Sequence, residues 1–273
     1  MFAIDSYYLI NHIEHEYKYP GRYGARGEKR KKKKKATPEQ VAKQNQYNRE
    51  VRIRRLLRNN FYPGDYWVTL KYKSGARKCM EEFIKDMGKF LRVMRREYKT
   101  RGEPLKFIYR LEIGKRGGLH AHIVINRLPG DAYTDLIIRD AWQKVTPDGS
   151  VDYTTIREQG GGKELAAYIV KQAGEEIAGQ MRMFSQEDQK KLIRISSSRN
   201  LDRVEPVRKI YRHWTMKKIL ENGPKPTQGY YIDKESIRTG VNRFTGFSYY
   251  KYTEVRIKPI DCRRKADPGG RHG

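Results

Sequence analysis

The sequence predicts an α+β protein built on a ferredoxin-like or RRM-like antiparallel sheet, in the order β-α-β-β-α-β, with extensions at both ends. Two patterns support this fold class: short segments rich in β-branched and aromatic residues alternate with longer segments that carry a helical apolar stripe. In addition, one loop between two strand-like segments is short and rich in glycine, which indicates an antiparallel hairpin. Helices in such a fold cover one face of the sheet and leave the other face for a helix or a ligand.

The first predicted helix begins at Thr37, which can form a capping box with Gln40, and Pro38 suits the first helical position. Apolar residues extend this helix to about residue 60. The elements expected after it are a strand at 66–72, a helix at 75–99, strands at 105–113 and 119–127, a helix at 131–145, a strand at 151–156 and a helix at 163–177. Residues 181–222 are expected to be mostly helical and basic.

The predicted organisation has three parts. Residues 1–36 are expected to form a flexible basic arm, because they include Lys29, Arg30 and five consecutive lysines, and dense like charge is usually solvated or docked on phosphates. Residues 37–222 are expected to hold the folded domain with its flanking helices. Residues 223–273 are expected to be a tyrosine-rich, basic extension.

The charge of the chain indicates a polyanionic partner. The formal net charge is +27, from 59 lysines and arginines against 32 acids, and such self-repulsion opposes compaction unless an anion binds. Nucleic acid is the commonest partner of this kind, since each neutralised phosphate releases counterions. The 20 tyrosines suit stacking on unpaired bases. Composition alone favours a passive binder and an enzyme about equally.

Other classes of protein are disfavoured by the sequence. No apolar run approaches the roughly 18 residues that span a bilayer, so we expect no membrane association. The N-terminus lacks the layout of a secretory signal. Two distant cysteines, Cys79 and Cys262, give neither a disulfide framework nor a zinc finger. We therefore expect a cytoplasmic protein.

Two of the six histidines, His120 and His122, lie two positions apart in a predicted strand. Residues i and i+2 of a strand point to the same face, so both imidazoles can reach one cation, although such a pair alone is more often structural. The loop at 114–118, of sequence Gly-Lys-Arg-Gly-Gly, allows a register that pairs Glu112 with His120. Two imidazoles and one carboxylate with open positions favour a catalytic site for Mg²⁺ or Mn²⁺.

A tyrosine follows on the helix predicted at 163–177. Leu165, Ile169 and Ala173 recur at helical spacing and are expected to pack on the sheet, while Tyr168 and Lys171 follow a neighbouring polar stripe. A phenol with a pKa near 10 is a poor nucleophile at neutral pH, but a nearby ammonium or metal favours the phenolate. Taken alone, a packing role for this tyrosine is the more common outcome.

Together these segments resemble a known superfamily. Glu112, the strand LHAHIVIN at 119–126 and the helix AAYIVKQ at 166–172 look like the metal motif and the Tyr-x-x-Lys motif of the HUH endonucleases. Within them the chain is most similar to the replication-associated proteins of phages and plasmids, including the filamentous-phage nicking protein. The resemblance covers about residues 50–215.

The resemblance implies a role for each motif residue. It assigns the divalent ion to Glu112, His120 and His122. It makes Tyr168 the nucleophile that attacks a DNA phosphodiester and becomes joined to the 5′ phosphate, which leaves a 3′ hydroxyl for a polymerase. Lys171 would hold the phosphate or lower the pKa of the tyrosine.

Four further residues are expected to contact DNA. Thr69 stands where many relatives keep a threonine-rich first motif, although Lys71 replaces a second threonine. Arg110, Lys115 and Arg116 surround the hairpin and are expected to bind phosphates, with an ordinary solvated turn as the alternative.

The expected partners are single-stranded or origin DNA and the replication machinery of a bacterial host. Residues 160–163, Gly-Gly-Gly-Lys, lack the upstream glycine of a Walker motif, so a helicase would come from the host along with the polymerase. Because Gln172 occupies the position one turn after the tyrosine motif, termination would need a second protomer or a second strand transfer at Tyr168. A dimer is therefore one expectation.

Two alternatives stay open from the sequence. A transfer relaxase or a single-tyrosine transposase uses the same chemistry and the same residues. A non-catalytic basic protein with the same fold would bind RNA or DNA without forming a covalent adduct.

Overall fold

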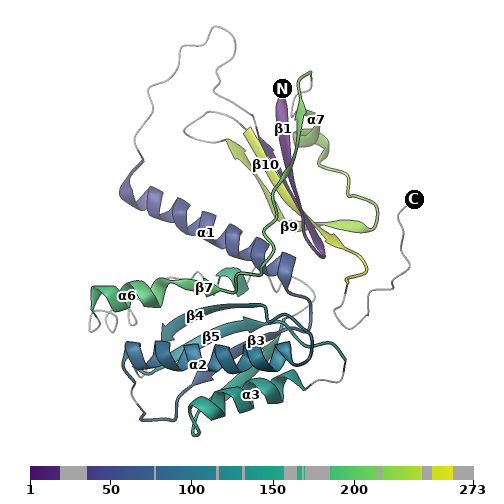
Figure 1. Ribbon diagram of the computed structural model, residues 1–273. Helices are drawn as coiled ribbons and strands as arrows, with labels where there is room; N and C mark the ends of the chain where they lie inside the picture. The colour runs from purple at the N-terminus through teal and green to yellow at the C-terminus, as the bar shows by residue number, and fades with distance from the viewer. Residues whose placement is uncertain are drawn as a thin grey trace. The chain divides into compact units, whose positions relative to one another are not determined.

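The structure is a computed structural model that describes residues 1–18, 36–76, 78–114, 117–130, 133–156, 165–167, 169, 185–213, 217–241 and 248–260. The described chain divides into two compact units (Figure 1). One consists of residues 1–48 and 203–260, and the other is built on residues 49–202. Each unit contains one five-stranded sheet.

The sheet of the central unit has the predicted order of elements. Its strands are β3 (Tyr66–Lys71), β4 (Phe107–Ile113), β5 (Leu119–Ile125), β6 (Ser150–Thr155) and β7 (Ile195–Ser197), arranged β6-β3-β5-β4-β7 with every neighbour antiparallel. Helix α2 (Met80–Lys99) connects β3 to β4, and helix α3 (Thr134–Val145) connects β5 to β6. The α+β, ferredoxin-like prediction is confirmed.

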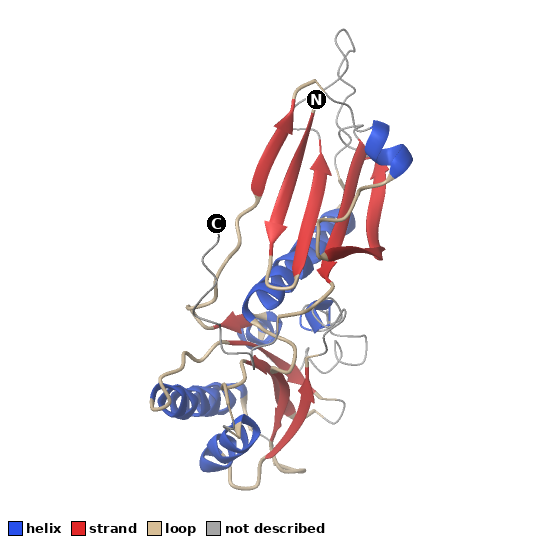
Figure 2. Ribbon diagram, turned by 90° about the vertical axis from the view of Figure 1, so that its right-hand side faces the viewer, coloured by secondary structure: helices blue, strands red, loops and turns tan. Residues whose placement is uncertain are grey.

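One face of this sheet packs on α2 and α3, which lie side by side in both views (Figures 1 and 2). The strands alternate with period two, so every second side chain enters this core. The fully buried core members include Val68, Leu70, Ala121 and Ile123 from the strands, and Phe83, Phe90, Ile138 and Trp142 from the helices. The remaining strand residues must therefore face the opposite side of the sheet.

Helix α1 (Pro38–Asn60) begins with the predicted capping box. The Thr37 amide donates to the Gln40 side chain at 3.2 Å, and the Gln40 amide donates to the Thr37 hydroxyl at 3.3 Å. At its other end the helix buries Leu56 and Leu57 in a cluster with Ile108 of β4. The prediction of helices on one face only is thus incomplete, because α1 covers part of the second face with a basic helix whose apolar residues are few.

The other unit corrects the prediction of an arm at residues 1–36. Strands β1 (Phe2–Tyr8) and β2 (His12–Lys18) join β8 (Val207–Tyr211), β9 (Tyr230–Val241) and β10 (Ser248–Arg256) in a sheet of order β8-β1-β2-β10-β9. The expected C-terminal extension supplies two of these strands. The reason is a pairing between distant segments, such as Tyr17 with Tyr250 in the register of β2 and β10. The lysine run lies outside the described residues.

Two shorter helices complete the described elements, α6 (Gln186–Ile193) and α7 (Lys217–Asn222). The expectation that residues 181–222 are mostly helical is wrong for β7 and β8. Both are short strands that pair at the edge of a sheet. Among the described residues, none of the helices has the length and apolar character required to cross a bilayer.

Replacement of Trp142 tests the core on which the site rests. Its side chain is fully buried, and its indole N–H donates to the Lys71 carbonyl at 3.0 Å, so it fixes the end of β3. We expect Trp142→Ala to lower the free energy of unfolding by roughly 3–5 kcal/mol, measured by denaturant titration. Leu136→Ala, at a 38% exposed position of the same helix, should change it by less than about 0.5 kcal/mol. Equal losses would contradict this packing.

Candidate functional site

The candidate site lies on the face of the central sheet that is turned away from α2 and α3. Ala121 and Ile123 of β5 are fully buried in the core on the helical side. Because side chains alternate along a strand, His120 and His122 face the other side. His122 is 8% exposed, and His120 is half-buried.

The register of the hairpin brings an acid to the two histidines. Glu112 of β4 pairs with His120 of β5, as the sequence predicts. The carboxylate itself leans to the neighbouring position, where its Oε2 lies 2.9 Å from Nε2 of His122. The acid and one imidazole are therefore in direct contact across the hairpin.

Strand β3 holds His122 from the opposite side. The hydroxyl of Thr69 lies 3.1 Å from Nδ1 of His122, and the two residues are partners in the β3–β5 register. The indole of Trp67 stacks on the imidazole with 5.4 Å between ring centroids and an interplanar angle of 12°. In a neutral ring, Nε2–H donates to Glu112 while Nδ1 accepts from Thr69, so the tautomer and the orientation of the ring are both fixed.

His120 lies against the start of the hairpin loop. A Cβ atom at Gly114 would come within 2.5 Å of Cε1 of His120, so the ring occupies the space that a side chain at 114 would fill. Burial is the main cause that lowers the pKa of His120, with the charges of His122 and Lys71 acting in the same direction. The neutral form that this favours is the form in which an imidazole binds a metal.

Three residues beside the histidines were not singled out as site residues from the sequence. Lys71 of β3 forms an ion pair with Asp152 of β6, and both charges act on His120. Trp67 is the third residue of β3 on this face. Period-two alternation along β3 and β6 identifies these residues once the strand order is known, but the sequence does not reveal which strands are neighbours.

The donor types fit a divalent ion. Two imidazoles and a carboxylate on adjacent strands can supply three ligands and leave positions for water and phosphate. Glu112 and His122 are in contact, and Glu112 acts electrostatically on His120. Within the ranges that the structure describes, however, no three His, Cys, Asp or Glu side chains converge closely enough to form a metal cluster.

The segment that precedes and follows the predicted nucleophile is seated on the same face of the sheet. Ala166 and Ile169 are 1% exposed, and they pack in one cluster with Ile108 and Val124, the residues of β4 and β5 that share the face of the histidines. Leu165 packs against the same cluster, as predicted. Tyr168, Lys171 and Ala173 lie outside the described residues.

Arg110 contacts this segment. Its Nη1 donates to the carbonyl oxygen of Ile169 at 3.2 Å, so the side chain joins β4 to the segment. Phosphate binding by Arg110 stays a prediction, as does DNA contact by Thr69. Lys115 and Arg116 lie outside the described residues, between Gly114 and Gly117, whose backbones are joined by a hydrogen bond of 2.8 Å.

Comparison with known proteins agrees with this site. Residues 65–173 match the family model described as Replication-associated protein ORF2, or gene 2 protein, and this stretch contains β3 to β6, the hairpin and the segment around Ile169. No curated protein and no solved structure gives a significant match. The match supports a role in DNA replication, and over its central sheet the chain is similar to the replication-associated proteins of this family.

Proposed function

We propose that the protein is a site-specific, single-strand DNA endonuclease that initiates rolling-circle replication through a covalent link to Tyr168. The observation that carries this proposal is the shared face of the sheet. The contact between His122, Glu112 and Thr69 lies on the face where Ala166 and Ile169, the neighbours of Tyr168 in the sequence, are buried. A metal site and a tyrosine on one face are what the reaction needs.

Glu112, His120 and His122 are the residues that would hold Mg²⁺ or Mn²⁺. A bound divalent cation polarises the scissile phosphate and stabilises negative charge in the transition state. Thr69 and Trp67 are positioning residues in this proposal, because they contact His122 and fix its ring rather than touch the phosphate. Such outer contacts orient the ligands of a metal site.

The proposed reaction exchanges one phosphodiester bond for another. The phenol oxygen of Tyr168 attacks the phosphorus and releases its proton to solvent, while the bond from phosphorus to the 3′ oxygen breaks. This oxygen takes up a proton and leaves as a 3′ hydroxyl, and the 5′ phosphate stays on the tyrosine. Lys171 is proposed to stabilise the phenolate or the phosphate charge. Arg110 would hold the segment in place through the Ile169 carbonyl.

The alternatives differ in what the site must do. A relaxase or a single-tyrosine transposase would use the same residues on a different DNA. A non-catalytic binder would derive its affinity from the basic surface and would have no need for His122 to be fixed on both ring nitrogens. The ordered imidazole favours the enzyme.

The proposal predicts a covalent adduct that depends on one tyrosine. Wild-type protein, incubated with Mn²⁺ and a single-stranded DNA library of random sequence labelled at the 3′ end, should yield labelled protein on a denaturing gel. Tyr168→Phe should yield none, because the phenol oxygen is absent. The control is Tyr133→Phe, at a position 70% exposed within the stretch that matches the family, and it should react normally.

Sequencing the DNA released from the adduct identifies the cleaved site. Salt-sensitive DNA binding by the wild type without an adduct would favour the non-catalytic binder. An adduct that persists in Tyr168→Phe would assign the nucleophile to another residue.

Substitution of one glycine tests the position of His120. In Gly114→Ala the new methyl group overlaps the His120 ring, which can swing away because it is the end of a side chain, so the fold should persist. We expect the affinity for Mn²⁺ to fall at least as much as it does when an outer partner of a ligand is removed, roughly tenfold or more. Calorimetric titration measures this loss.

The hairpin itself provides the control. In Gly118→Ala the new Cβ would lie 3.8 Å from the same ring, an ordinary contact, so the affinity should stay near that of the wild type. If both variants bind Mn²⁺ like the wild type, His120 is not a ligand.

Removal of the Thr69 hydroxyl tests the orientation of His122. Thr69→Val keeps the shape of the side chain but deletes the contact to Nδ1, so the ring loses one of its two polar partners. We expect the Mn²⁺ affinity to fall by roughly 10–100-fold, together with a shift of the His122 ring signals in the NMR spectrum. Thr69→Ser retains a hydroxyl and should restore both. Unchanged ring signals in Thr69→Val would show that the hydroxyl does not position this histidine.

A further inference from the structure

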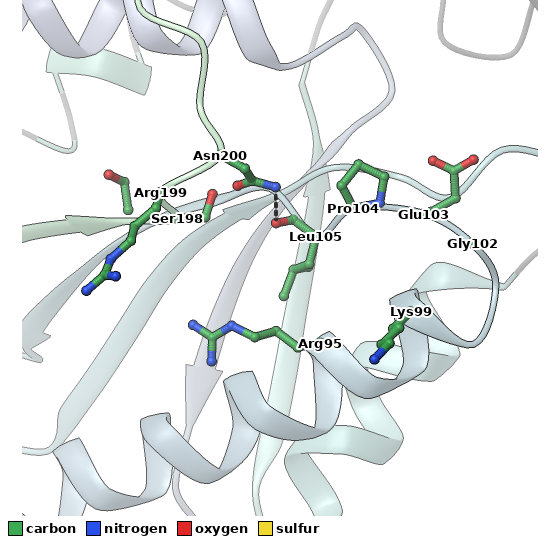
Figure 3. A pocket seen from close by; sticks show the side chains of 10 residues that line it. Arg95, Lys99, Gly102, Glu103, Pro104, Leu105, Ser198, Arg199 and Asn200 are labelled. Atoms are coloured by element: carbon green, nitrogen blue, oxygen red, sulfur yellow. Dashed lines mark hydrogen bonds between the residues drawn. The ribbon is translucent and has the colours of Figure 1, made fainter.

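A second polar feature lies at the other end of β4 from the candidate site. A groove of about 890 Å³ runs between the C-terminal part of α2, the loop at 102–105 and the segment at 197–200 (Figure 3). It begins beside Phe107, whose side chain belongs to the core on the α2 side. Five residues of extended strand, about 17 Å, separate Phe107 from Glu112. The groove and the candidate site are therefore distinct places.

The groove is lined by three cations and one acid. Arg95 and Lys99 lie one turn apart on α2, and Arg199 lies on the segment across the groove, with Glu103 in the loop (Figure 3). Within the described ranges none of the three cations forms an ion pair with an acid. The formal charge of the lining is thus positive, and it is concentrated on two sides of one concave surface.

Several neighbouring cations are neutralised, in contrast to those of the groove. Arg101 pairs with Glu97 at 3.0 Å, and Lys106 pairs with Asp202 at 3.3 Å. Lys85, earlier on α2, pairs with Glu81 at 2.9 Å. The groove therefore gathers cations whose charge no ion pair among the described residues offsets.

The walls of the groove are held in place by hydrogen bonds. The Ser198 amide donates to the Phe107 carbonyl at 3.0 Å, and the Phe107 amide donates to the Ser198 hydroxyl at 3.1 Å. The Asn200 side chain donates to the Leu105 carbonyl at 3.1 Å (Figure 3). Arg95 lies over the Phe107 ring, 5.6 Å from its centroid. A polar wall that is already ordered loses little conformational entropy when an anion binds.

We propose that this groove binds the phosphate backbone of a nucleic-acid strand, at a site separate from the one that cuts it. Guanidinium groups and an ammonium suit phosphate oxygens, and the Ser198 hydroxyl proton can be donated as well, since its oxygen serves Phe107. An open groove with cations on two sides fits a chain of phosphates. The choice of nucleic acid as the partner rests on the proposed function, but the binding needs no cleavage.

The salt dependence of binding tests the groove. The wild type and the triple variant Arg95→Gln, Lys99→Gln, Arg199→Gln are titrated, without divalent metal, into a fluorescent single-stranded oligonucleotide at several NaCl concentrations. Each lost phosphate contact lowers the slope of log K against log salt by about 0.7 for a single strand, so the slope should fall by about 2. A duplex of the same sequence forms a second arm, with a change of about 0.9 per contact.

The control variant removes the same charge elsewhere in the unit. Lys85→Gln, Arg139→Gln, Lys144→Gln changes three cations of α2 and α3 that do not line the groove, and the slope should remain near that of the wild type. Equal losses in the two triple variants would reduce the effect to net charge and overturn the proposal. An unchanged slope in the groove variant on both DNA forms would overturn it as well.

Two further measurements separate binding from folding and from a free anion. Arg95→Lys, Arg199→Lys keeps the charges while it removes the guanidinium groups, and we expect it to keep the wild-type slope. A loss as large as that of the glutamine variant would indicate distortion of the groove and contradict the proposal. Inorganic triphosphate should compete only weakly. Tight competition that depends on Arg95, Lys99 and Arg199 would identify a pocket for a free phosphate compound instead. Failure to detect an adduct in the nicking assay leaves these results unaffected.

Discussion

The register of the β4–β5 hairpin is the constraint on which the candidate site depends. Side chains alternate along β5, so the same seven residues send Ala121 and Ile123 into the core and both histidines to the opposite face. A slip of one residue would bury the imidazoles among the apolar side chains of α2 and α3 and expose the core residues. The free energy that the core gains from burial therefore also fixes the chemistry of the other face, because one register satisfies both.

That second face is divided into an apolar half and a polar half. Toward one end, Ile108 and Val124 bury the end of α1 together with Ala166 and Ile169, and toward the other end the strands carry the histidines and Glu112. A helical segment can therefore be anchored by apolar contacts while it stays close to polar groups. The Arg110 contact to the Ile169 carbonyl lies near the boundary between the halves. An active site that needs a tyrosine beside a metal ion requires this combination of a firm anchor and an open polar surface.

Local patterns made part of this structure predictable. The capping box of Thr37 and Gln40 and the pairing of Glu112 with His120 depend on residues close in the sequence, and both are confirmed. The sheet formed by β1, β2 and the C-terminal strands was missed, because its partners are separated by some two hundred residues and no local pattern encodes such a pairing. The contact of Thr69 with His122 was missed for the same reason: it requires knowing that β3 lies beside β5.

The two histidines differ in how firmly the fold holds them, and this difference bears on mechanism. His122 has partners on both ring nitrogens and an indole against its face, so its orientation is fixed before any ligand binds. His120 depends on the absence of a side chain at Gly114, in a loop whose length and composition are not constrained by the core. A ligand held by a loop can adjust its position when metal and phosphate arrive, at a cost in affinity. The arrangement combines one rigid imidazole, which sets the position of the cation, with one adaptable imidazole, which can accommodate the change in coordination as DNA enters and leaves.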